Sequence, residues 1–222
     1  MICVSLVAST AEEILQQAEG LQEADLLEIR LDALEEPRVA PFLEKIRRPL
    51  LFTFRAREEG GLREAPLAKR LACLQEAAQG GAWGVDLELA AGKEAIEALR
   101  RTCQGTKLLL SFHDFEGVPP LSRLKELVEE MKRLGADWGK VVVTVGQAAE
   151  ALPILSLIPW ARKELAFPLT AFAMGPEGKY SRLVCLLLGA PLTYAAPPGG
   201  VAAAPGQLPC DKLRQAWELF AP

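Results

Sequence analysis

Short apolar runs alternate with amphipathic segments along the whole chain. The runs have the lengths expected of strands and lie at residues 2–6, 26–31, 50–54, 84–89, 107–112, 138–145, 167–172 and 190–194. The clearest helical segment, 121–134, repeats its apolar residues with the period of a helix and places on one face Leu121, Leu124, Leu127, Val128, Met131 and Leu134. A final helix is predicted over 211–220, with Asp211 as its N-cap. Repeated strand–helix units predict a parallel sheet, and about eight of them in one chain predict a closed (β/α)8 TIM barrel.

Several of the predicted strands carry polar residues at alternate positions. Side chains at i and i+2 share one face of a strand, so these strands have one apolar and one polar face. The polar positions are Glu28, Arg30, Asp32, Thr53, Arg55, Asp86, Glu88, Ser111 and His113. In a barrel the polar face lines the lumen near the C-terminal strand ends, where barrel active sites lie. An antiparallel sheet with one wet face conflicts with the helix-length connections, whereas a doubly wound open sheet stays possible on this pattern alone.

Length and composition fit one α/β unit. The 222 residues are 50% hydrophobic and 24% charged, and barrels of about 250 residues form one domain, so we expect residues 1–222 to be a single domain. The net charge of -4 gives no general attraction to nucleic acid or to an anionic membrane. No apolar run reaches the roughly 18 residues of a membrane span. The strand-like start lacks the basic region of a signal peptide, so a cytoplasmic location is expected.

His113 is the only histidine in the chain, which excludes a His-rich metal site. The 5 cysteines are scattered without a CxxC pair, so neither a zinc site nor a disulfide framework is expected. His113 ends an apolar strand, and its position alone leaves both a structural and a functional role open. A GxSxG elbow is missing, so a serine hydrolase of that type is not indicated. What remains is one imidazole that can exchange protons near neutral pH.

Lys140 enters a predicted strand and shares a face with Trp138, Val142 and Thr144. The surrounding glycines do not have the spacing of a phosphate-binding loop. Burial among apolar groups lowers the pKa of a lysine, and a neutral amine can attack a ketone to form an imine. The alternative is a lysine at the strand edge whose side chain extends into solvent.

Two loops after the later strands carry further candidates. Met174 opens a glycine-containing turn that leads to Ser181 and Arg182 at a helix start, where an anion is favoured and an arginine can grip a carboxylate with two hydrogen bonds. The loop from Ala203 to Gln207 is rich in Pro, Gly and Ala. Loops at that end of a barrel often close over substrate.

Taken together, these segments resemble type I 3-dehydroquinate dehydratases over nearly the whole chain. The matching segments, in chain order, are VSL at 4–6, EIRLD at 28–32, FTFR at 52–55, EGG at 59–61, DLE at 86–88, HDF at 113–115, GAD at 135–137 with Lys140, MG at 174–175, SR at 181–182 and PGQ at 205–207. No single segment carries the resemblance; their order and spacing do.

The resemblance implies a cofactor-free, metal-free barrel enzyme, usually a homodimer, that converts 3-dehydroquinate to 3-dehydroshikimate in the shikimate pathway of aromatic amino-acid biosynthesis. It implies that Lys140 forms an imine with the C3 ketone, and that His113 removes the C2 proton and delivers a proton to the departing C1 hydroxyl. Glu59 then orients His113. The implied substrate-binding residues are Ser5, Glu28, Arg30, Arg55, Met174, Arg182, Ala203 and Gln207.

The chain departs from the family pattern at three places. Ala203 stands where the family loop usually has serine, so one lid hydrogen bond to substrate is in doubt. Phe172 replaces a frequent methionine, which we expect to change packing only. The chain starts directly at the first strand, so we expect the N-terminal hairpin that plugs the barrel bottom in many members to be missing. A class I aldolase-like barrel and a non-enzymatic metabolite-binding relative stay open as alternatives.

Overall fold

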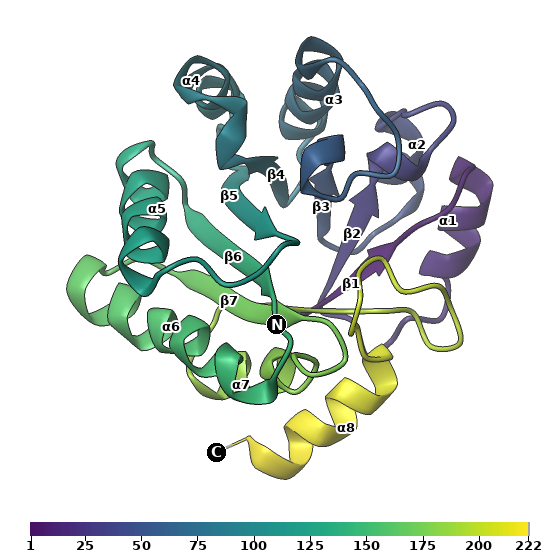
Figure 1. The fold of residues 1–222 in the computed structure, drawn as a ribbon. Helices are drawn as coiled ribbons and strands as arrows, with labels where there is room; N and C mark the ends of the chain where they lie inside the picture. The colour runs from purple at the N-terminus through teal and green to yellow at the C-terminus, as the bar shows by residue number, and fades with distance from the viewer. Residues whose placement is uncertain (222) are drawn as a thin grey trace.

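Eight parallel strands form the inner ring of the computed structural model, which describes residues 1–221 (Figure 1). They are β1 (Ile2–Leu6), β2 (Leu26–Arg30), β3 (Leu50–Thr53), β4 (Gly84–Glu88), β5 (Lys107–Asp114), β6 (Trp138–Thr144), β7 (Leu169–Met174) and β8 (Thr193–Ala195). Neighbours in the sheet follow the order β7-β6-β5-β4-β3-β2-β1-β8. A doubly wound sheet reverses its order at a switch point, and no reversal occurs in this ring. The predicted TIM barrel is confirmed.

Helices connect successive strands and cover the outside of the ring (Figure 1). They are α1 (Ala11–Ala18), α2 (Ala40–Lys45), α3 (Leu67–Gln79), α4 (Lys93–Thr102), α5 (Leu121–Arg133), α6 (Ala151–Leu165), α7 (Ser181–Leu187) and α8 (Cys210–Phe220). Within residues 1–221 no helix combines the length and the apolar character needed to cross a membrane.

The apolar face predicted for α5 is buried except at its first residue. Leu124, Leu127, Val128 and Met131 are buried, but Leu121 is 37% exposed. Helical side chains tilt toward the N-terminus, so the side chain of the first residue projects beyond the packed part of the helix. The helical spacing of apolar residues does not distinguish Leu121 from the buried residues of the same face.

The predicted N-cap Asp211 is wrong. Helix α8 starts one residue earlier, at Cys210, after Pro209, and no side chain caps it. The backbone N–H of Cys210 donates to the carbonyl of Ala196 at 2.9 Å. This tertiary bond fixes the start of the helix after Pro209, so Asp211 lies inside the first turn and not at the N-cap.

Two strands are displaced from their predicted positions because of prolines. The run 167–172 becomes β7 at Leu169–Met174, and the run 190–194 becomes β8 at Thr193–Ala195. Pro168 and Pro191 lack the N–H that a strand donates to its neighbour, so each strand begins after its proline.

In the described residues, the backbone hydrogen bonds between neighbouring strands run from β7 round to β8. Contacts of side chains close the remaining gap between β7 and β8. The hydroxyl of Thr170 donates to the carbonyl of Leu192 at 3.0 Å. The rings of Phe172 and Tyr194 meet at the same seam, with centroids 6.1 Å apart. At the N-terminal strand ends, Trp83 and Trp138 pack edge to face at 5.0 Å.

Candidate active site

One cavity at the C-terminal strand ends brings together every residue that the sequence pointed to as acting on or holding a substrate. It opens to solvent, and its empty space, including the part open to solvent, is about 640 Å³. The expected residues that line it are Ser5, Glu28, Arg30, Arg55, Glu59, His113, Lys140, Met174, Arg182, Ala203 and Gln207. The parallel register explains the convergence, because it sets Ser5 beside Glu28 and Lys140 beside Ser111 on adjacent strands.

Lys140 lies on the lumen side of β6 and is only 6% exposed. This excludes the alternative in which its side chain extends into solvent. Its Nζ lies 3.4 Å from Oδ2 of Asp86 and 4.0 Å from the centroid of the Tyr194 ring. Burial lowers the pKa of Lys140, and Arg55 adds to this effect, while the Asp86 carboxylate opposes it. The site therefore brings an amine with a lowered pKa into a cavity wide enough for a small molecule.

Asp86 is the central anion beneath the cavity, and the sequence indicated only that it faces the lumen. Its carboxylate accepts a hydrogen bond from Nη2 of Arg55 at 2.7 Å and one from the hydroxyl of Ser111 at 2.6 Å. Burial favours the neutral acid, but Arg55 and Lys140 outweigh it and hold the pKa of Asp86 at about 2. Asp86 thus stays ionised and fixes both an arginine and the lysine of the cavity.

His113 and Glu59 form a hydrogen-bonded pair between β5 and the turn after β3. One carboxylate oxygen, Oε2 of Glu59, accepts from the backbone N–H of His113 at 3.1 Å and lies 3.0 Å from Nδ1 of its ring. Burial, together with Arg55 and Lys140, lowers the pKa of His113 well below 6.5. When Nδ1 carries the proton toward Glu59, Nε2 keeps its lone pair and can take a proton from a substrate.

Burial raises the pKa of Glu59 to about 7, although Arg55 opposes the shift. Glu88 and Asp86 add to the increase, because a third buried negative charge nearby is unfavourable. Near neutral pH, Glu59 is therefore present in both its ionised and its neutral form. The ionised carboxylate can accept a hydrogen bond from the Nδ1–H of His113 with either oxygen, whereas the neutral acid carries a proton on one of them.

Polar side chains on β1 to β3 form a rigid wall of the cavity. The carboxylate of Glu28 accepts from the hydroxyl of Ser5 at 2.6 Å and from the hydroxyl of Thr53 at 2.7 Å. Arg30 donates two hydrogen bonds to Asp32, at 2.8 and 2.6 Å. Such paired groups have fixed orientations, which suits the recognition of several hydroxyl groups on one ligand.

Arg182 is held between an aromatic ring and the loop that precedes α8. Its guanidinium carbon lies 4.4 Å from the centroid of Phe172, and it donates to the carbonyls of Gly206 and Pro205 at 3.1 and 3.2 Å. Burial lowers the pKa of Arg182 to about 10, so it remains a cation at neutral pH. No carboxylate lies within salt-bridge distance of Arg182 among the described residues, which leaves its charge available to an anionic ligand.

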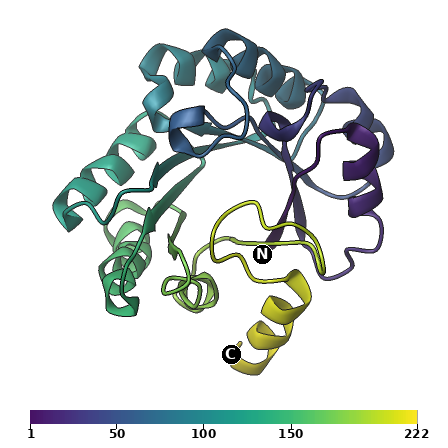
Figure 2. The same cartoon turned by 45° about the vertical axis from the view of Figure 1, so that its right-hand side comes forward.

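The loop before α8 arches over the ring of strands (Figure 2). The amide Nε2 of Gln207 donates to the hydroxyl of Ser5 at 3.2 Å, and its Oε1 accepts from the backbone N–H of Ala203 at 2.7 Å. A Cβ at Gly206 would lie 2.5 Å from the carbonyl oxygen of Gly175, and its φ is +77°. Glycine at 206 therefore allows this loop to lie directly on the turn after β7.

Sequence reasoning assigned no site role to several residues that line the cavity. Tyr194 belongs to its lining, Phe115 lies at its mouth over Gly60, and Val142, already expected on the face of Lys140, lines it as well. Tyr194 belongs to the short strand β8, where alternation over three residues carries little signal. Among residues 1–221, no group of three or more His, Cys, Asp or Glu side chains is arranged to hold a metal ion.

The sequence and the fold of this chain are similar to those of known proteins. The family model described as "Type I 3-dehydroquinase" matches residues 2–221. A 3-dehydroquinate dehydratase of Desulfotalea psychrophila is 37% identical over 215 residues, which cover 96% of this chain and 95% of the relative. The crystal structure of the 3-dehydroquinate dehydratase from Geobacillus kaustophilus superposes with a TM-score of 0.91 at 30% identity, covering 100% of this chain and 92% of the other.

A third similar protein was crystallised with a covalent ligand. It is a type I 3-dehydroquinate dehydratase from Clostridium difficile, described with covalently modified comenic acid, and it superposes with a TM-score of 0.88 at 27% identity. The match covers 99% of this chain and 91% of that one.

Proposed function

The chain belongs to the type I 3-dehydroquinase family, and from this premise we propose that it dehydrates 3-dehydroquinate to 3-dehydroshikimate through an imine on Lys140. The observation that carries the proposal is the placement of the buried Lys140 amine and the His113–Glu59 pair in one cavity. Family membership favours a hydro-lyase over the class I aldolase that the sequence left open.

The reaction begins at Lys140. The neutral amine attacks the C3 ketone to give a carbinolamine, and this takes up one proton from solvent, relayed by His113, as its hydroxyl leaves as water and a protonated imine forms. This cation draws electrons from the neighbouring C2–H bond, so the hydrogen becomes acidic enough for a side-chain base. The lowered pKa of Lys140 supports this role, because it increases the fraction of neutral amine.

His113 then moves the proton. Its Nε2 takes the C2 proton, and the electron pair left at C2 forms a double bond to C1 as the C1 hydroxyl leaves with a proton from the imidazolium. One water molecule is released in that step, and the hydrolysis of the imine consumes the water that was lost when it formed. Glu59 acts through His113, by holding Nδ1 at 3.0 Å and stabilising the imidazolium.

The remaining lining residues have binding roles in the proposal. Glu28, Arg30 and Arg55 bind the ring hydroxyls, and Ser5 lies beside Glu28. Arg182 and Gln207 bind the carboxylate, since Arg182 is a buried cation with no anionic partner among the described side chains. Met174 packs against the substrate ring. Ala203 contributes no side-chain donor, so its loop contacts the ligand through other groups.

The proposal includes a cytoplasmic homodimer that serves aromatic amino-acid biosynthesis, with residues 1–222 as its one catalytic domain. Light scattering on the purified protein tests the dimer. A mass equal to one chain across the micromolar range would contradict it.

Borohydride trapping tests the imine. Reduction in the presence of 3-dehydroquinate converts an imine to a stable secondary amine, and mass spectrometry should place it on the peptide with Lys140. Lys140→Ala should give no adduct. Lys107 and Lys179 are internal controls, because Lys107 lies over Trp138 at the opposite barrel end and Lys179 is exposed. An adduct on either of them instead of Lys140 would overturn the assignment.

A further inference from the structure

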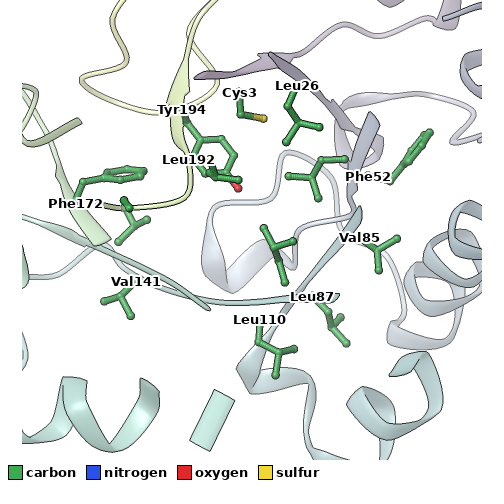
Figure 3. Packing of buried hydrophobic residues seen from close by; sticks show 14 of the residues in the cluster. Cys3, Leu26, Phe52, Val85, Leu87, Leu110, Val141, Phe172, Leu192 and Tyr194 are labelled. Carbon is green, nitrogen blue, oxygen red and sulfur yellow. The ribbon is translucent and has the colours of Figure 1, made fainter. Parts of the chain in front are cut away.

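Two of the four basic side chains that line the cavity, Lys140 and Arg182, rest on aromatic rings, and the two rings are neighbours. The Nζ of Lys140 lies 4.0 Å from the centroid of Tyr194, and the guanidinium of Arg182 lies 4.4 Å from that of Phe172. The ring centroids are 6.1 Å apart, with an angle of 54° between the planes. Figure 3 shows Phe172 and Tyr194 close together, each on its own strand of the ring.

These rings occupy the seam of the barrel. Phe172 belongs to β7 and Tyr194 to β8, the two strands at the ends of the described ladder. Ladder hydrogen bonds hold the other strand pairs in register, whereas side-chain packing holds this one. Tyr194 is 2% exposed and Phe172 is 1% exposed, so the rings have little freedom to move away from the cations they contact.

The hydroxyl of Tyr194 does not account for the position of this residue. Among residues 1–221 it is a buried polar atom with no hydrogen-bond partner. A buried hydroxyl without a partner destabilises a fold. The ring therefore contributes through its face, and the face is the part that Lys140 contacts.

We propose that Tyr194 is a positioning residue for Lys140 whose ring face stabilises the Nζ cation, as an ammonium in the free protein and as the protonated imine during turnover. The face of an aromatic ring carries negative charge and attracts a cation within about 6 Å. A desolvated contact of this kind favours the cation by a factor of about 30. The turnover part of the proposal rests on the imine proposed above; the free-protein part does not.

Other charges also face Lys140, and they stay constant in the test. They are Asp86 on β4, Glu28 and Arg30 on β2, Arg55 just after β3, His113 on β5 and Arg182 on α7. Asp86 supports the ammonium from one side at 3.4 Å, and the Tyr194 ring supports it from another. Substitutions confined to the ring separate the two contributions.

The experiment replaces Tyr194 by phenylalanine and by pentafluorophenylalanine. Tyr194→Phe removes the hydroxyl and keeps the ring, while the fluorinated ring keeps nearly the same shape and reverses the charge of its face. The pKa of Lys140 is measured in the free protein from the pH dependence of its reaction with methyl acetimidate, an electrophile that only the neutral amine attacks. The Lys140 peptide is quantified by mass spectrometry.

We expect Tyr194→Phe to keep the Lys140 pKa within a few tenths of a unit of the wild type. The fluorinated variant should lower it by about 1 unit or more relative to Tyr194→Phe, and should reduce kcat about tenfold. Pentafluorophenylalanine at position 172 is the matched control, because Phe172 contacts Arg182. It should raise KM and leave the Lys140 pKa unchanged.

Equal Lys140 pKa values in the phenylalanine and pentafluorophenylalanine variants would overturn the proposal. A shift already complete in Tyr194→Phe would overturn it as well, since the hydroxyl would then be the active group. The pKa measurement needs no substrate, whereas borohydride trapping does. Failure of the ring contact and failure of the imine mechanism are therefore seen in different experiments. Thermal unfolding of each variant shows whether the fold is intact.

Discussion

Replacing Glu59 by glutamine removes one negative charge beside His113 and leaves the hydrogen bonds possible. Both contacts end on the same oxygen of Glu59, at 3.0 Å from Nδ1 and 3.1 Å from the backbone nitrogen of His113. A glutamine amide oxygen can take the place of Oε2 and accept both. The variant therefore tests the charge of Glu59 and keeps its shape.

The expected loss follows from the charge that His113 acquires. As imidazolium forms, the Glu59 carboxylate attracts it, and at 3.0 Å the attraction amounts to about 5.5 kcal/mol for full charges at an effective dielectric constant of about 20. Only part of that charge is present in the transition state. Hydrogen bonds to charged groups contribute about 1.5–3 kcal/mol, so we expect kcat to fall about 10- to 150-fold, with KM within about twofold of the wild type.

The pH profile provides a second, independent readout. Because the pKa of Glu59 is raised to about 7, the carboxylate is lost as pH falls through that value. The wild-type kcat/KM should therefore decline below about pH 7, and Glu59→Gln should lack this decline. The assay is the ultraviolet absorbance of the conjugated enone product. Glu58→Gln is the control, since Glu58 is the exposed neighbour of Glu59 and should behave as the wild type.

Two results would refute this reasoning. One is a Glu59→Gln variant that keeps more than half of the wild-type kcat, which would mean that the charge does not assist His113. The other is an unchanged decline near pH 7 in that variant, which would assign the ionisation to a different group.

Three further substitutions test the remaining roles. His113→Ala should lower kcat at least about 10³-fold, and borohydride should still trap intact, undehydrated substrate on Lys140; retention of more than a tenth of wild-type kcat would point to another proton shuttle. Arg182→Lys should raise KM about 10- to 150-fold, the scale of about 1.5–3 kcal/mol for a charged hydrogen bond, as measured by initial rates; a KM within twofold would remove Arg182 from carboxylate binding. Ala203→Ser should keep or improve kcat/KM, because a serine adds one donor to the loop that Gln207 organises, and a tenfold loss would indicate a different closed geometry.

The repetition of strand and helix determined the architecture from the sequence alone. Alternation with period 2 placed Glu28, Arg30, Arg55 and His113 on the lumen side of their strands, and the structure agrees. This works because the face of a strand residue depends only on its position along the strand. The start of β7 after Pro168 follows from proline's missing N–H, which the sequence shows but the spacing pattern ignores. The start of α8 at Cys210 depends on a tertiary hydrogen bond to Ala196, which the sequence does not show.

The partners of the site residues were decided only by the tertiary structure. His113 is 54 positions from Glu59, and Lys140 is 54 positions from Asp86. The sequence suggested that His113, Lys140 and Glu59 share one site, partly through resemblance to a family. It could not show that Asp86 holds the lysine, or that Tyr194 lies beneath it. Those contacts depend on which strands become neighbours around the closed ring, and the lowered pKa of Lys140 depends on the burial that the closed ring creates.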